Sequence, residues 1–143
     1  MVSTLPAHRD DHVQDDQLAL PIPAHIGDQF SLRYHIALAT MKAGKGNASA
    51  AQALLEMILA AGLLADCGHG RLDSQRARAA ERALRRTAEV GLRSGKWKVS
   101  TDGFDALCTM VTEHDLQLSQ ANARDVMRVL AFVYDLSWHG HRA

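Results

Sequence analysis

The residues of this chain best suited to chemistry are the arginines of one basic segment. Residues 71–98 hold nine basic and three acidic residues, although the whole chain has no net charge. At about 100° per residue the arginines share one face of a helix. Guanidinium groups bind planar anions through paired hydrogen bonds, so this face predicts contact with nucleic acid or with an acidic protein surface. The predicted binding residues are Arg78, Arg82, Arg85, Arg86, Arg93, Lys96, Trp97 and Lys98.

The same arginines also fit a solvated helix face without a partner. Acidic residues stand one turn from several of them, and such pairs stabilise an exposed helix. The expected pairs are Glu81 with Arg85, Arg82 with Glu89, and Glu89 with Arg93. Both interpretations of the arginine face stay open at this point.

Trp97, between two lysines, has two interpretations. Its indole either stacks on a nucleic-acid base while the lysines contact phosphates, or folds back onto the core. A DNA-reading helix-turn-helix is disfavoured, because the connection from Cys67 to Asp73 is longer than a tight turn. The arginine face also lacks the interleaved polar side chains that read bases.

Three further residues carry possible enzyme chemistry, namely Glu56, His35 and His114. Glu56 interrupts an apolar run, so it lies either on an exposed stripe or in an ion pair with His35, Arg33 or Lys42. His114 and Asp115 are adjacent, and adjacent helical side chains diverge by about 100°, so this pair does not form a catalytic dyad.

We instead expect the ring of His114 to pack at the edge of the core, with Asp115 and Gln117 bonding the following turn. The chain contains no nucleophile elbow, phosphate loop, dinucleotide fingerprint or zinc motif. We therefore expect a non-enzyme without metal or cofactor.

The elements that position these residues are predicted to be helices. Alanine and leucine are abundant and aromatics make up 5% of the chain, which suits helix interfaces better than sheets. The sequence predicts a compact all-α bundle of about five helices over residues 28–143. Residues 1–27 hold all three prolines and predict a poorly ordered or extended tail, in which residues 18–24 lie against the folded body.

Capping residues and apolar periodicity place the helices at about 28–43, 47–65, 73–93, 101–118 and 119–136. The second is apolar on nearly every side and should be the central helix. The third buries a narrow face of small residues that allows close packing against a neighbour. The expected N-caps are Asp28, Asn47 or Ser49, Asp73 or Ser74, Thr101, and Ser119.

The apolar content also bears on partners and location. If Leu55, Leu59 and Leu63 are not all covered within one copy, a partner helix should cover them, which favours a homodimer. Cys67 and Cys108 are expected to be reduced and buried. The apolar run from Ala53 to Ala65 is too short to span a membrane, so we expect a cytoplasmic protein without membrane contact.

Three short strings carry a resemblance: Tyr34–Leu38 (YHIAL), Trp97–Ser100 (WKVS) and His114–Leu118 (HDLQL). Over roughly residues 30–136 the chain resembles small uncharacterised helical proteins of proteobacterial plasmids and integrated mobile elements. Some of those proteins are labelled transcriptional regulators. The resemblance implies an accessory or regulatory role and brings no active site.

Together these observations predict a non-catalytic accessory or regulatory module that binds another macromolecule as a homodimer. A nucleic-acid-binding regulator that uses the arginine-rich helix is the alternative, and an enzyme around Glu56, His35 and His114 is a remote one.

Overall fold

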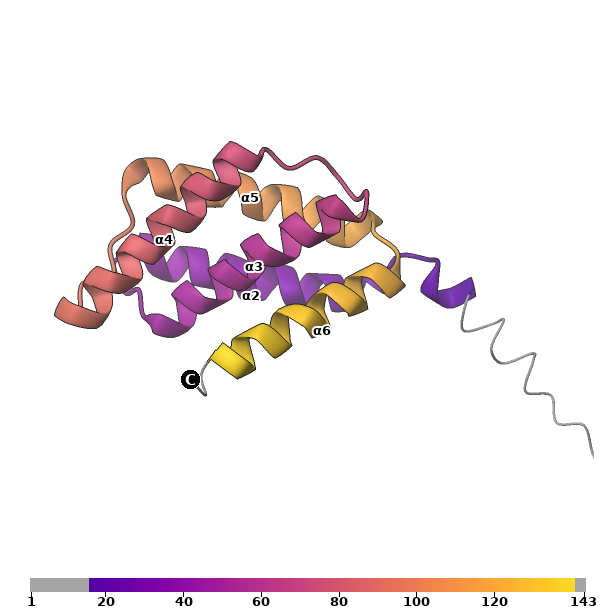
Figure 1. Ribbon diagram of the computed structural model, residues 1–143, viewed down its shortest axis with the longest axis horizontal. Helices are drawn as coiled ribbons and strands as arrows, with labels where there is room; N and C mark the ends of the chain where they lie inside the picture. Colours follow the sequence, from indigo (N-terminus) through magenta and orange to yellow (C-terminus); the bar gives the residue numbers. More distant parts are fainter. Residues whose placement is uncertain (1–15, 141–143) are drawn as a thin grey trace, which may run out of the picture.

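The computed structural model describes residues 16–140, with side chains through residue 136. The predictions for residues 1–15 and 141–143 lie outside this range. The described part is all-α, as predicted, and five long helices form a compact bundle (Figure 1). They are α2 (Ala24–Lys42), α3 (Ala48–Asp66), α4 (Ser74–Ser94), α5 (Thr101–Gln120) and α6 (Ala123–Gly140).

Helix α3 is the centre of the bundle and packs against all four of the other long helices (Figure 1). Leu54, Met57, Ala60 and Ala61 of this helix have no exposed surface. A helix that is apolar on most sides is stable in water only when neighbours surround it. The predicted central position of this helix is therefore confirmed.

The core has two clusters that meet along α3. One joins α2, α3, α4 and α5 around Tyr34, Leu54, Leu84 and Met110. The other joins the second half of α3 to α6, and Ile22 from the segment before α2 packs into it. That segment also pairs with the start of α6, because the Ala123 amide donates to the Leu20 carbonyl at 2.7 Å. The expectation that residues 18–24 include extended chain against the body is thus confirmed around residues 20–22.

Two of the predicted helix starts are wrong. Helix α2 begins at Ala24 directly after Pro23, whereas Asp28 lies inside the helix, so the bundle begins before residue 28. The fixed backbone angle of a proline suits the start of a helix without a side-chain cap. Ser119 does not cap α6 but donates to the Leu116 carbonyl; Asn122 accepts from the Asp125 amide at 2.9 Å instead.

The other N-caps fall at or next to their predicted positions. Asn47 accepts from the Ala50 amide, so it and not Ser49 caps α3. Asp73 caps α4, as predicted. Ser100 caps α5 one residue before the expected Thr101. Neighbouring polar residues compete for one cap, and the position of the first helical turn decides between them.

Helix α4, which carries most of the predicted basic residues, packs closely against α5. A side chain at Gly103 would place its Cβ 2.4 Å from the Cβ of Ala83, so the two helices approach as closely as small residues allow. Ala80, Leu84 and Gly91 are buried on the inner face of α4, as predicted. Gly95 then ends α4 with a positive φ of 75°, which turns the chain back toward α5.

Candidate anion-binding groove

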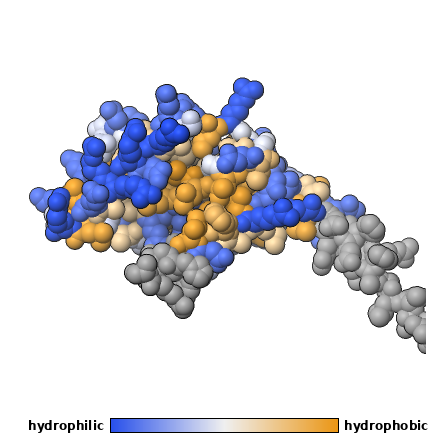
Figure 2. Space-filling view, in the orientation of Figure 1, coloured by the Kyte–Doolittle hydropathy of each residue, from blue (hydrophilic) through white to orange (hydrophobic). Residues whose placement is uncertain are grey.

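Four of the predicted basic residues line one groove between α4 and the start of α5. They are Arg82 and Arg86 of α4 and Lys96 and Lys98 of the following loop. The groove has a volume of about 600 Å³. We call it the basic groove. Figure 2 shows hydrophilic side chains gathered over α4, on the side of the molecule away from α6.

Local structure explains why these four side chains converge. Arg82 and Arg86 are four residues apart, so they project from the same face of α4. The chain after Gly95 is not helical, and alternate residues of an extended segment point to the same side, which places Lys96 and Lys98 together. The turn at Gly95 brings this loop back beside the helix that holds the arginines.

The basic groove has an excess of positive charge. None of its four cations makes an ion pair within the described residues. Asp102 is the only carboxylate among the described residues that line it. The first turn of α5 also lines the groove, and the N-terminus of a helix carries a partial positive charge. The described lining of the groove therefore carries a net positive charge.

The remaining predicted binding residues lie elsewhere. Arg85 pairs with Glu81 at 2.8 Å, as the solvated interpretation expected, and lines a different hollow of the surface. Arg78 and Arg93 are exposed and do not line the basic groove. The expected pairs of Glu89 with Arg82 and with Arg93 do not form in the part of the chain that the structure describes. The arginine face is thus divided between three environments.

Trp97 packs against the first core cluster, in agreement with the second of its two interpretations. Its indole lies against Gly91 of α4, where an added Cβ would come within 2.2 Å of the ring. Its backbone lies against Gly46, where an added Cβ would be 2.7 Å from the Trp97 carbonyl oxygen. Trp97 therefore anchors the loop that carries Lys96 and Lys98.

A buried polar network lies at the opposite end of α5. His114 is fully buried, not at the core edge as expected, and its ring lies 5.5 Å from the ring of Tyr34. The side-chain amide of Gln117 donates to the carbonyls of Ala61 at 2.9 Å and His69 at 3.0 Å. Its oxygen therefore accepts from Nδ1 of His114 at 2.9 Å, which places the proton of the neutral ring on Nδ1.

The predicted partners of Asp115 and Gln117 were wrong, because both reach other helices instead of the following turn. Asp115 accepts from Ser31 and contacts His35 Nε2, each at 2.7 Å, and so joins α5 to α2. Gln117 joins α5 to the end of α3.

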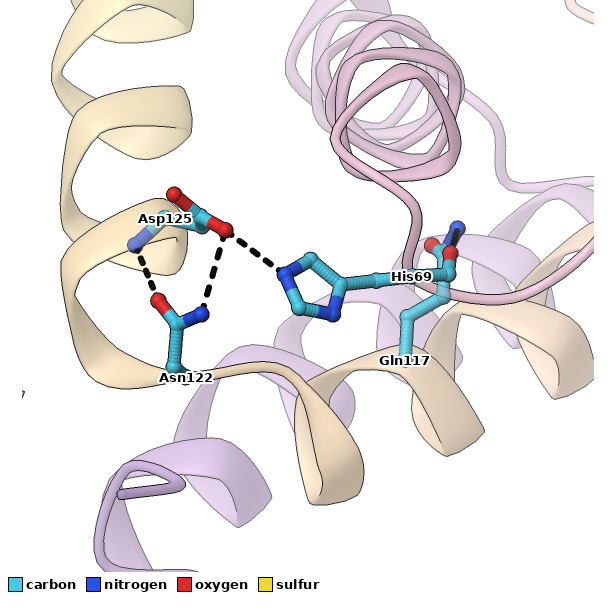
Figure 3. Close-up of polar contacts among 4 residues, drawn as sticks. All are labelled: His69, Gln117, Asn122 and Asp125. Carbon is cyan, nitrogen blue, oxygen red and sulfur yellow. Dashed lines mark hydrogen bonds and ion pairs between the residues drawn. The ribbon is translucent and has the colours of Figure 1, made fainter. Parts of the chain in front are cut away.

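A second histidine–carboxylate contact joins the loop after α3 to the first turn of α6 (Figure 3). His69, in the loop after α3, contacts Asp125 of α6 through Nε2 at 2.7 Å. Asn122 also donates to Asp125, at 3.2 Å. The hydrogen bond with His69 is the main reason that the pKa of Asp125 lies below its usual value. The contact joins the loop after α3 to α6.

The residues of the enzyme alternative are not brought together. Glu56 pairs with Arg33 at 2.8 Å, which is one of its three expected partners. His35 contacts Asp115, and His114 contacts Gln117. No hydrogen bond or ion pair joins any two of Glu56, His35 and His114 in the described structure. Each of the three links neighbouring helices or packs in the core.

Metal ligands and cysteines add no further site among the described residues. Within them no group of three or more histidine, cysteine, aspartate or glutamate side chains could hold a metal ion. Both cysteines are free; Cys108 is partly buried, whereas Cys67 is exposed, contrary to its expected burial. Cys67 is exposed because α3 ends at Asp66, so the residue belongs to the surface loop.

His114 leads to a prediction for the dependence of stability on pH. Burial lowers its pKa below the ordinary value of 6.5. When the pH falls through 6.5, the unfolded chain takes up a proton that the folded protein does not, so the free energy of unfolding should decrease. His114→Gln should flatten this decrease, which urea unfolding of both proteins between about pH 7.5 and pH 5 measures. An unchanged slope in the variant would contradict the assignment.

The class of protein that the fold defines is an all-α helical bundle. The chain matches no family model, no curated protein and no solved structure. One helix of the described part, α3 (Ala48–Asp66), is long and apolar enough to cross a membrane, contrary to the length expected from its apolar run. It is half buried inside the bundle, and the central helix of a soluble bundle has the same composition, so this is weak evidence.

Proposed function

We propose that the protein is a non-catalytic module that binds an acidic segment of another protein through the basic groove, and that it acts as a homodimer. The observation that carries the proposal is the convergence of Arg82, Arg86, Lys96 and Lys98 on one concave surface, where none of them forms an ion pair with another described residue. Unpaired cations in a groove strengthen and steer the approach of an anionic partner.

The walls of the groove favour a protein segment over nucleic acid. Ala83, Val90 and Val99 line the basic groove beside the four cations. Apolar walls contribute to the binding of a peptide with apolar and acidic residues, whereas contacts to phosphates make no use of them. The indole of Trp97 packs against the core, and no aromatic ring is among the described residues that line the groove, which favours a protein segment over stacked bases.

A charge-reversal experiment tests this proposal. The probe is a fluorescent peptide of alternating glutamate and leucine, titrated with the protein at low and at physiological salt. Arg82→Glu with Arg86→Glu should weaken binding at least about tenfold, because two attractive contacts become repulsive. The matched control is Arg78→Glu with Arg93→Glu, which changes the net charge equally outside the groove and should weaken binding by less than about threefold.

Two outcomes would overturn the proposal. Equal losses for the two double variants would mean that only the overall charge matters. Tighter binding of a mixed duplex DNA than of the peptide, with the same dependence on Arg82 and Arg86 and a steep loss with salt, would make the protein a nucleic-acid-binding regulator instead.

A further inference from the structure

A second hollow lies over α3, between α4 and α6, and it differs from the basic groove in chemistry. Figure 2 shows hydrophobic side chains in this region between the two flanking helices. The hollow has a volume of about 530 Å³. Its walls include Leu55 and Leu59 of α3, Leu92 of α4, and Val133 and Leu136 of α6. We call it the apolar hollow.

Large apolar side chains at this hollow remain exposed to solvent. Leu92 is 76% exposed, Leu136 48% and Leu59 43%. Phe132, one turn before Leu136 on α6, is 53% exposed. Leu59 belongs to the central helix, whose other faces are covered by its four neighbours. Clustered exposure of this kind marks an interaction surface, whereas scattered single side chains do not.

The charges at the apolar hollow are already balanced within the chain. Arg85 on the α4 side pairs with Glu81, and Glu56 on the α3 side pairs with Arg33. Both charged residues that the structure describes in this lining already have an ion pair, so the hollow does not favour a strongly charged partner. The hollow carries one cation and one anion, so in a two-fold arrangement the Arg85 side of each copy can face the Glu56 side of the other.

We infer that the apolar hollow is the contact between two copies of this chain. A second copy offers the same apolar surface with the same two charges, and the exposed Leu92 of each copy can enter the hollow of the other. The whole chain has no net charge, so two copies do not repel each other at long range. The inference identifies the interface of the homodimer in the proposed function, and it does not depend on the basic groove.

The amount of apolar surface agrees with this contact. Three side chains that line the hollow, together with Phe132 one turn from Leu136, are between 43% and 76% exposed. They supply on the order of 300–450 Å² per copy if a large apolar side chain offers about 150–200 Å². A standard interface buries about 800 Å² per partner, of which somewhat more than half is apolar. Leu55, Ala88 and the polar residues at the edge can supply the rest.

Sedimentation equilibrium from about 1 to 200 μM tests the inference. The wild-type protein should dimerise in this range, and Leu92→Glu should raise the dissociation constant at least about tenfold, because it buries a charge in an apolar contact. Leu136→Glu is the second variant. The matched control is Leu116→Glu on α5, where the side chain is 57% exposed and away from the hollow; it should leave the dissociation constant unchanged.

Circular dichroism establishes that the variants are folded, which their exposed positions favour. A wild-type protein that is monomeric over the whole concentration range, or equal weakening of the dimer by Leu116→Glu, overturns the inference. A monomer would indicate instead that the hollow binds a helix of a different protein. Charge reversal at Arg82 and Arg86 should leave the dimer intact. Loss of peptide binding and loss of the dimer therefore report on the two proposals separately.

Discussion

Replacing Gln117 with leucine is expected to reduce the free energy of unfolding by about 3–5 kcal/mol. Its side chain satisfies the Ala61 carbonyl, the His69 carbonyl and Nδ1 of His114 at once. Leucine has a similar size but forms none of these bonds, so three polar groups lose a partner, two of them in the core. Each such loss costs roughly 1–3 kcal/mol, and the losses are not independent.

Urea unfolding followed by circular dichroism measures this effect. Gln120→Leu is the matched control, because it makes the same change three residues later at an exposed position of α5. That variant should stay within about 0.5 kcal/mol of the wild type. A Gln117→Leu protein as stable as the Gln120→Leu protein would show that the network contributes no net stability.

Gln117 links α5 to the end of α3 because of how these helices pack, and the sequence alone does not reveal this packing. Periodicity places the residue near the buried face of α5, where a glutamine has no obvious purpose. Its partners are backbone carbonyls near the end of α3, 48 and 56 residues away. Such contacts depend on how two helices meet, and no local pattern encodes that.

The Asn122–Asp125 pair, by contrast, has a local signal in the sequence. Asn122 is followed three residues later by Asp125, which is the spacing of a capping box. Ser119 fits an N-cap by residue type alone, because serine is common at that position. The chain instead continues α5 through Gln120, and the bridge between residues 21 and 122 positions the next helix.

The basic groove was only partly predictable for a related reason. Helical geometry places Arg82, Arg85 and Arg86 on one side of α4, and the exposure of all three confirms this. The three arginines lie in different surroundings because a different part of the molecule borders each flank of α4. The start of α5 meets the flank with Arg82 and Arg86, whereas the flank with Arg85 borders the apolar hollow. A single helix pattern defines a face, and only the tertiary fold divides it.

The second large effect is expected at Gly91, where alanine should reduce the free energy of unfolding by about 2–4 kcal/mol. Its Cβ would lie 2.2 to 2.6 Å from three atoms of the Trp97 indole, far inside contact distance. Helix α4 is packed against α3 and α5, which opposes a shift of its backbone. The indole must therefore leave its place, which exposes a large apolar surface or strains the helix.

Gly62→Ala provides the matched control, because this glycine also lies inside a helix but an added Cβ would meet no atom within 4 Å. Alanine there should stabilise the protein by about 0.5–1 kcal/mol, since it restricts the unfolded chain and favours the helix. Thermal unfolding measures both changes in stability. A red shift of tryptophan emission in Gly91→Ala but not in Gly62→Ala would show that the indole has moved.

The Gly91→Ala variant should also weaken binding of the acidic peptide, because Trp97 stands between Lys96 and Lys98. Unchanged affinity with a displaced indole would mean that the loop does not position the lysines of the basic groove.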